Sequence, residues 1–277
     1  MTPREAPVGL PLVDRLDSLT SVTLDDYVRA VSEYVTSSDT LTAGNKKAAQ
    51  IRLSAALGKA LLVELRLRIP NLAGYAGERN VAGALRTVQS DVSEFHPLDG
   101  LRLAIEIKPI NLAIGRALWN RFGDIRTFAV NLHLKFPFAV VGGVLTAPVV
   151  DRAKGGRVVD VRHLLDRAVH RLVRAGGRRN EGEAPHLLEG VALVAYDPRT
   201  GQLDPSLPAP GSGLRWSEFV TALAQSYDAR FGEGPGTVSG EGMDTDEQAS
   251  EEEPQTQPRL AAEPRESYDV PDDEEPT

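Results

Sequence analysis

Residues 101–108, LRLAIEIK, alternate strictly between apolar side chains at odd positions and other side chains at even positions. A period of two over eight residues is typical of a half-buried β-strand, because successive side chains of a strand point to opposite faces. The four apolar side chains then share one face. Glu106 and Lys108 stand side by side on the other face, which also carries the small Ala104. The fold must therefore bury one side of this strand and hold a carboxylate beside an ammonium on the other.

The same strand is predicted to form one half of a β-hairpin. Residues 85–92, LRTVQSDV, are typical of a partner strand, and residues 97–100, PLDG, of the connecting turn. A turn centred within this segment places Asp91 opposite Glu106, with their Cβ atoms about 5 Å apart. The register is conditional, because the proline of the turn cannot donate to the ladder and the loop can be longer than two residues. In this register two carboxylates and the Lys108 ammonium converge, which suits a divalent cation.

Cysteine usage and hydropathy limit the class of protein. The chain has no cysteine among its 277 residues, which excludes disulfides and thiolate metal sites and favours a reducing compartment. It has no run of about 18 apolar residues, so we expect no membrane span. Residues 1–17 are broken by proline and aspartate and lack the apolar core of a signal peptide. These features together lead us to expect a cytoplasmic protein.

The formal charge of −8 is unevenly distributed along the chain. Residues 232–277 contain 15 acidic side chains and two arginines, a net charge of −13, and few apolar residues, so we predict a disordered tail. The remaining residues carry a net charge of +5. A basic body with an acidic tail hints at a polyanionic partner. The tail either competes with that partner or only adds solubility.

The apolar periodicities predict an α/β fold, a central mixed β-sheet flanked by helices on both faces. We divide the chain into an N-terminal lead-in at 1–22, an α/β domain at 23–231 and the acidic tail at 232–277. Besides the hairpin, we predict helices at 24–35, 46–68, 112–122, 124–134, 158–174 and 214–231, and strands at 138–145 and 187–196. Thr23, Asn111 and Asp124 are the predicted helix caps. The helix at 46–68 is expected to bury Ile51, Ala55, Leu62 and Leu65.

An aspartate followed by Glu-x-Lys at the end of a hairpin, with a helix after it, resembles the PD-(D/E)XK nuclease superfamily. The resemblance covers residues 46–145 and implies a restriction-endonuclease-like core. It implies that Asp91 and Glu106 bind Mg²⁺, that Ile107 contributes its backbone carbonyl, and that Lys108 orients the attacking water. Phosphodiester hydrolysis needs charge stabilised on phosphoryl oxygens and a nucleophile near neutral pH. A hard cation held by two carboxylates supplies both.

Two other carboxylates are candidates for this site. Asp99 follows Pro97 and Leu98, closer to the family pattern than Asp91, which follows serine. A strand beginning at Asp99 nevertheless places it about 23 Å from Glu106 and on the opposite face, so Asp99 fits a turn better. Glu64, inside the apolar run LLVELRL, is either a solvated helix position or an accessory catalytic carboxylate aimed at the site.

Basic and polar residues near the hairpin are candidates for nucleic-acid binding. Arg116, Asn120, Arg121 and Arg126 surround Trp119 and can contact phosphates. Alternatively Trp119 is core and the arginines form a solvated face. The loop GGRR at 176–179 also suits phosphates. Glu106 and Lys108 themselves have a plain alternative as surface charges of an edge hairpin.

These residues lead us to expect a Mg²⁺-dependent DNA endonuclease of restriction type. The resemblance further implies double-stranded DNA as substrate, a homodimer with one site per strand, and a cognate DNA methyltransferase encoded nearby. Two alternatives stay open. One is a non-catalytic nucleic-acid-binding protein on the same fold, and the other is a nuclease acting on RNA or a repair intermediate.

Overall fold

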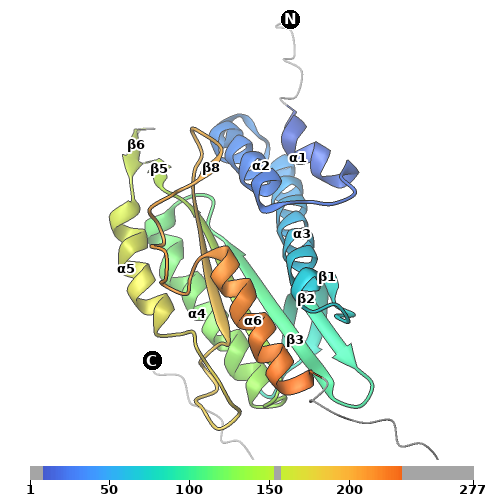
Figure 1. Cartoon of the computed structure of the whole chain (residues 1–277). Helices are drawn as coiled ribbons and strands as arrows, with labels where there is room; N and C mark the ends of the chain where they lie inside the picture. The colour runs from blue at the N-terminus through green and yellow to red at the C-terminus, as the bar shows by residue number, and fades with distance from the viewer. Residues whose placement is uncertain (1–8, 153–156, 233–277) are drawn as a thin grey trace, which may run out of the picture. The chain divides into compact units, whose positions relative to one another are not determined.

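The computed structural model describes residues 9–152 and 157–232, which form a mixed six-stranded sheet with helices on both faces (Figure 1). The helices are α1 (Pro11–Arg15), α2 (Leu24–Ser37), α3 (Ala43–Arg68), α4 (Ile114–His133), α5 (Arg162–Val173) and α6 (Trp216–Phe231), with 3-10 turns at Leu16–Ser18 and Ser38–Thr40. The sheet runs in the order β1 (Tyr75–Ala82), β2 (Thr87–His96), β3 (Gly100–Pro109), β4 (Val140–Pro148), β7 (Gly190–Asp197) and β8 (Gln202–Leu203). Strands β5 (Val150–Arg152) and β6 (Val158–Asp160) pair separately.

The sheet combines an antiparallel meander with a parallel centre. β1, β2 and β3 are antiparallel neighbours, whereas β3, β4 and β7 run parallel and β8 returns antiparallel. Parallel neighbours need a crossover, and α4 supplies it between β3 and β4. Every residue of β4 is buried, as the continuous apolar run at 138–145 predicted for a strand covered on both faces. The predicted α/β class with a mixed sheet is therefore confirmed.

Each face of the sheet has its own apolar core. Helices α2, α3 and α6 pack on one face, where Leu57 and Phe219 meet Ile105 of β3. Helices α4 and α5 pack on the other face, where Ile125 and Leu165 lie. Within the described residues, no helix combines the length and the apolar character that a bilayer crossing requires.

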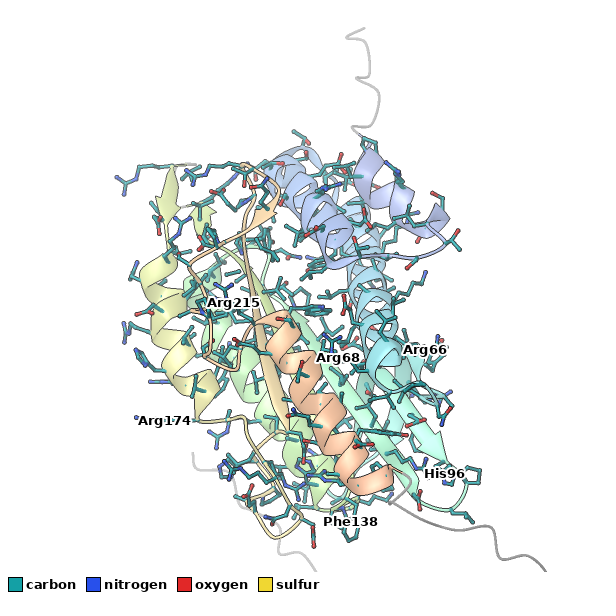
Figure 2. The ribbon with its side chains drawn as sticks, in the orientation of Figure 1. Arg66, Arg68, His96, Phe138, Arg174 and Arg215 are labelled. Carbon is teal, nitrogen blue, oxygen red and sulfur yellow. The ribbon has the colours of Figure 1, made fainter. Side chains whose placement is uncertain are left out.

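The predicted strand at 101–108 is present, but its alternation breaks at Arg102. Glu94 pairs with Leu103 and Phe95 pairs with Leu101, so Arg102 is an extra residue in β3. This β-bulge turns Leu101 into the core on the α4 side, although Leu103 faces the α3 side. His96, at the end of β2, marks the tip of this hairpin (Figure 2).

Helix α2 and helix α3 confirm two predicted helices with one correction. Thr23 caps α2 as predicted, because its hydroxyl accepts the Asp26 N–H while the Asp26 carboxylate accepts the Thr23 N–H. In α3 the predicted buried stripe is wrong at Ile51, which is 59% exposed, and at Ala55. Leu62 and Leu65 are buried as predicted, and Leu53, Leu57 and Leu61 complete the buried face.

The two helices predicted at 112–122 and 124–134 are one continuous helix, α4. Asp124 lies inside it and does not cap it; its carboxylate pairs with Arg121 one turn earlier, 3.1 Å from the Arg121 guanidinium. Asn111 does not cap it either. The first N–H, that of Ile114, donates to the Asp151 carboxylate at 2.8 Å, so β5 supplies the cap. The predicted helix at 158–174 is also shorter, because residues 158–160 form β6.

The predicted N-terminal lead-in packs into the core from residue 10 onward. Leu10, Val13 and Leu16 are buried, and the N–H groups of Leu12 and Val13 donate to Glu33 on α2. Residues 10–22 therefore belong to the α/β domain. Residues 1–8 and all but the first residue of the predicted tail at 232–277 lie outside the described residues.

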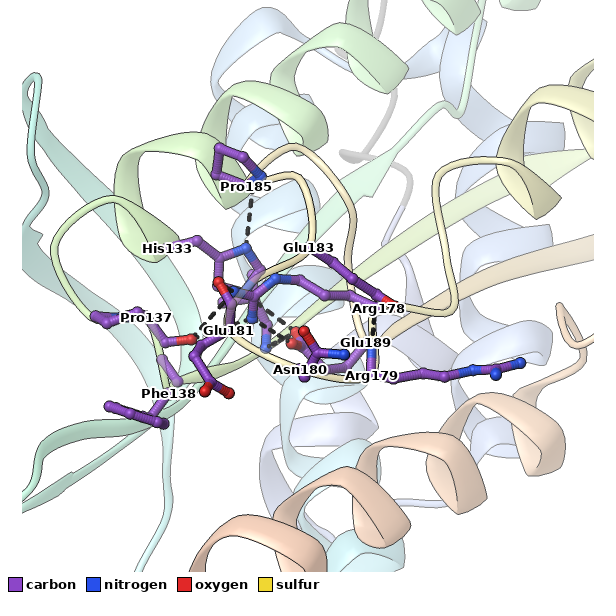
Figure 3. A network of polar contacts seen from close by, with 12 residues as sticks. His133, Pro137, Phe138, Arg178, Arg179, Asn180, Glu181, Glu183, Pro185 and Glu189 are labelled. Carbon is purple, nitrogen blue, oxygen red and sulfur yellow. Dashed lines mark hydrogen bonds and ion pairs between the residues drawn. The ribbon is translucent and has the colours of Figure 1, made fainter.

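A buried ion-pair network joins the N-terminal ends of β4 and β7 (Figure 3). The Glu189 carboxylate forms hydrogen bonds with four groups. They are the guanidinium groups of Arg178 at 2.9 Å and of Arg230 on α6 at 2.7 Å, the His133 ring at 3.2 Å and the Val141 N–H at 2.7 Å. The side chain of Arg178 is only 1% exposed. This arginine of the GGRR loop therefore serves the fold, and it is not available to an external phosphate.

Candidate functional site

The site lies where β2 and β3 part. Their antiparallel ladder ends at the pair of Val92 with Ile105. Beyond that pair, within the described sheet, β2 continues against β1 and β3 continues against β4. The predicted pair of Asp91 with Glu106 lies one step beyond the end of this ladder and is not part of it. The charge of Asp91 nevertheless reaches Glu106 and raises its pKa.

The Asp91 carboxylate occupies the gap between the separating strands. Its Oδ2 accepts the backbone N–H of Ile107 at 2.6 Å, in place of a ladder bond between the strands. Burial raises the pKa of Asp91, while the Ile107 N–H and the Lys108 charge oppose that rise. A hydrogen bond from Ser54 of α3 also lowers this pKa. Asp91 is thus held by two elements, β3 and α3.

Glu106 is a buried carboxylate whose bonding is incomplete. The residue is 7% exposed, and its Oε1 forms an ion pair with the Lys108 ammonium. Its Oε2 is buried without a hydrogen-bond partner among the described residues. Burial raises the pKa of Glu106 to about 7, although Lys108 acts in the opposite direction. A buried acceptor with no donor is costly, and a cation at Oε2 would satisfy it.

Lys108 stands between two hollows that open beside these carboxylates. The first, which we call the Asp91 hollow, has a volume of about 340 Å³ and is lined by Asp91, Ile107 and Lys108 together with Gln50, Ser54, Glu78, Gln89 and Arg121. The second, the Glu106 hollow, has a volume of about 400 Å³ and is lined by Glu106 and Lys108 together with Asn80, Arg86, Gln89 and Asp124. Lys108 and Gln89 line both, so the two hollows are neighbours.

Two further carboxylates reach the site, and sequence reasoning missed them as site residues. The charge of Glu78, on β1, raises the pKa of Asp91, and the charge of Asp124, on α4, raises the pKa of Glu106. β1 was not predicted at all, and Asp124 was predicted as a helix cap. The only signal in the sequence was their residue type.

Gly143 explains how α4 comes so close to the site. This glycine of β4 pairs with Glu106 in the parallel ladder. A Cβ atom at this position would collide with Cγ2 of Ile125 on α4. The helix therefore packs directly on the strand backbone beside Glu106, which brings the adjacent Asp124 into the Glu106 hollow.

Glu64 does not join the other predicted site residues. Its carboxylate pairs with Arg68 one turn along α3, at 3.1 Å, and its side chain is 41% exposed. It lies ten residues after Ser54, about 15 Å farther along the helix axis. The role of an accessory carboxylate is therefore not supported. Asp99 pairs with Arg102 and His96 at the hairpin tip, consistent with a turn residue.

The predicted nucleic-acid contacts are spread around α4. Arg121 lines the Asp91 hollow, whereas Arg126 lines a different hollow toward α5. Arg116 and Asn120 are exposed. Trp119 is half-buried, with the Arg171 guanidinium 4.2 Å from its ring centre, so it is neither fully core nor free to stack on a base.

The carboxylates present suit a magnesium ion that keeps several waters better than an ion enclosed entirely by protein ligands. Among the described residues, no three His, Asp or Glu side chains are grouped closely enough to enclose an ion. Mg²⁺ is usually bound by one or two carboxylates together with waters and substrate phosphates. The orphaned Glu106 Oε2 and the adjacent Asp91 fit that pattern. Ile107 is placed between them, and the contribution of its carbonyl stays a prediction.

Comparison of the chain with protein-family models, with curated proteins and with solved structures finds no match.

Proposed function

We propose that this chain is a Mg²⁺-dependent DNA endonuclease of the PD-(D/E)XK type. The supporting observation is the set of polar groups where β2 and β3 separate: Asp91 accepts the Ile107 N–H, and the neighbouring Glu106 pairs with Lys108 while its Oε2 is buried without a hydrogen-bond partner among the described residues. Two carboxylates and an amine beside an open hollow are the groups that phosphodiester hydrolysis requires.

Asp91 and Glu106 would hold the ion, with the Ile107 carbonyl as a third oxygen. Bound there, Mg²⁺ supplies neutralisation of phosphoryl charge and a water of lowered pKa. The Ile107 N–H fixes the orientation of Asp91. The Asp91 hollow, which Asp91, Ile107 and Lys108 line, would take the phosphate.

Lys108 acts on the water and on the phosphate. Its ammonium is paired with Glu106 and its side chain is 25% exposed, so it can reach a substrate without leaving the site. From this position the amine orients the attacking water and offsets charge that develops on the phosphate. Arg121, at the Asp91 hollow, would contact the phosphate next to the scissile one.

Double-stranded DNA is the proposed substrate because the net charge of residues 1–231 is +5 and the Asp91 hollow has an arginine in its lining. The homodimer with one site per strand and the methyltransferase encoded nearby follow only from the resemblance. They belong to the proposal on that basis.

Conversion of supercoiled plasmid to nicked and linear forms tests the proposal. We expect cleavage with Mg²⁺, none with EDTA, and loss of at least a hundredfold in Lys108→Ala and Glu106→Ala. Glu64→Ala is the matched carboxylate control and should cut normally.

Two results would contradict the proposal. Normal cutting by both site variants would refute the site. A folded wild type that binds duplex DNA but cuts neither DNA nor RNA with any divalent cation would identify a binding protein instead. Cleavage restricted to RNA or to branched DNA would keep the site but change the substrate.

A further inference from the structure

A third hollow lies between α4 and α5, on the other flank of α4 from the Asp91 hollow. It has a volume of about 390 Å³ and is lined by Phe122, Arg126, Arg171, Arg174, Ala175 and His186. We call it the α4–α5 hollow. Arg174 follows the last turn of α5, and Figure 2 shows it at that end of the helix.

The arginines of this hollow have no acidic partner in the part of the chain that the structure describes. Arg126, Arg171 and Arg174 form no salt bridge with a carboxylate among the described residues. Other arginines in the same domain are paired, for example Arg121 with Asp124 and Arg162 with Asp204. Three like charges gathered in one concavity repel one another, and an anion would relieve that repulsion.

Local packing explains the orientation of each arginine but not their convergence. Arg171 lies over the Trp119 ring at 4.2 Å, and Arg126 lies over the Phe122 ring at 5.9 Å. Arg174 stands at the C-terminal end of α5, where a cation is favourable. The two ring contacts orient the guanidinium groups of Arg171 and Arg126. Preorganised guanidinium groups that leave their N–H donors free are well suited to a phosphate.

We propose that the α4–α5 hollow binds a backbone phosphate of the DNA, away from the phosphate that is cleaved. This inference rests on the proposed function for its choice of nucleic acid. Consecutive residues of α4, Arg121 and Phe122, line the Asp91 hollow and the α4–α5 hollow respectively. The two hollows are thus separated by roughly one helix diameter, about 10–12 Å. The major groove of DNA is about 12 Å wide, so one duplex can contact both flanks.

The exposed side chains between the hollows extend the same path. Arg116 and Asn120 are one turn apart on α4 and exposed. At about 100° per residue they lie on the solvent side of the helix, between Arg121 and Arg126. DNA that crosses α4 from the cleavage site would therefore contact Arg121 first, then Arg116 and Asn120, and then the α4–α5 hollow.

The salt dependence of DNA binding tests this site without requiring cleavage. Affinity of the full chain for a fluorescent duplex is measured in EDTA at several salt concentrations, for wild type and for the triple variant Arg126→Gln, Arg171→Gln, Arg174→Gln. Loss of one phosphate contact should reduce the slope of log K against log salt by about 0.9 and weaken binding about eightfold near 0.1 M salt. The triple lysine variant keeps the charge and should retain the wild-type slope.

Arg167→Gln is the matched control, because Arg167 is exposed on α5 but does not line the hollow. Thermal melting of each variant shows whether it is folded. An unchanged slope in a folded triple glutamine variant, or an equal change in Arg167→Gln, would overturn the inference. Inorganic phosphate provides a further arm. If it stabilises wild type through these arginines while the DNA slope stays unchanged, the site binds free phosphate and the assignment to DNA is wrong.

The two proposals can fail separately. Arginine-dependent binding without any cleavage would remove the nuclease proposal and leave the phosphate site. Cleavage that depends on Lys108, together with binding that ignores the three arginines, would do the reverse.

Discussion

Oδ2 of Asp91 accepts the backbone N–H of Ile107 at 2.6 Å, so a side chain on one strand bonds the backbone of the next at the point where the two strands separate. Asp91→Ala leaves this buried N–H without an acceptor. We expect it to lose about 1–3 kcal/mol in the free energy of unfolding. Asp91→Asn can still accept the N–H through its amide oxygen and should stay close to wild type in stability.

Urea denaturation and plasmid nicking together check this pair of variants. Both should be inactive, because neither provides the carboxylate charge for a cation. If Asp91→Asn proved as unstable as Asp91→Ala, the hydrogen bond would not be the reason for the loss.

Glu106 should make the fold less stable at alkaline pH. Burial raises its pKa from 4.5 in the unfolded chain to about 7 in the fold, so the folded state holds its proton more tightly. This contribution is complete below pH 4.5 and is lost as the pH rises through about 7. At pH 8 Glu106→Gln should therefore be more stable than wild type by up to about 3 kcal/mol, while at pH 4 the two should agree.

Urea denaturation of the two proteins at both pH values measures this difference. Glu64→Gln, at a position where the carboxylate is 41% exposed, is the control and should show no comparable gain. A Glu106→Gln variant that is less stable than wild type at pH 8 would mean that the Lys108 ion pair outweighs burial.

Magnesium and the proton should compete for Glu106. A carboxylate must lose its proton before it binds a cation, and the pKa of Glu106 is about 7. At low Mg²⁺ the cleavage rate should therefore rise with pH and reach half its plateau near pH 7. Higher Mg²⁺ should move that midpoint to lower pH. A midpoint that does not depend on the concentration of Mg²⁺ would show that another group controls the rate.

Glu189 should be essential for stability but not for the site. Burial alone would raise its pKa, but hydrogen bonding and charge from His133, together with Arg230 and the Val141 N–H, hold it at about 2. The stability it provides is present above the unfolded value of 4.5 and is lost as the pH falls toward 2. Glu189→Gln leaves the buried Arg178 without its charge partner and should cost about 3–5 kcal/mol.

Chemical denaturation at pH 7 measures that cost. The nicking rate per folded molecule should be the same for Glu189→Gln and wild type. The network lies at the N-terminal ends of β4 and β7 and includes none of the candidate site residues. A specific loss of activity in the folded protein would connect the network to the site.

Strict alternation was enough to predict β3 as a strand. Its register against β2 was predicted only in part. Next to the turn His96 pairs with Gly100 and Phe95 with Leu101, one residue away from the predicted register, and the predicted register holds only from Glu94 and Leu103 onward. The bulge at Arg102 escaped, because an extra residue in a ladder depends on the partner strand. The continuous α4 also escaped prediction, because Asp124 has the residue type of a cap but pairs with Arg121 inside the helix.

Contacts between distant parts of the chain could not be predicted from spacing. Arg178 can be buried because its guanidinium donates to the Glu189 carboxylate and to the Pro137 carbonyl. Glu78 and Asp124 joined the site through an unpredicted strand and through the docking of a helix. The site's chemistry, its metal and its substrate stay predictions, since they depend on molecules that the chain alone does not include.

The bare backbone at Gly143 acts as a spacer of minimal thickness under α4. The small size of Gly143 determines how deeply Asp124 and Arg121 sit relative to Glu106, although Gly143 itself lines neither the Asp91 hollow nor the Glu106 hollow. A single added methyl group would lift the helix and widen the mouth on both of its flanks. The depth of the candidate site is thus set from beneath the helix, at a residue that has no side chain.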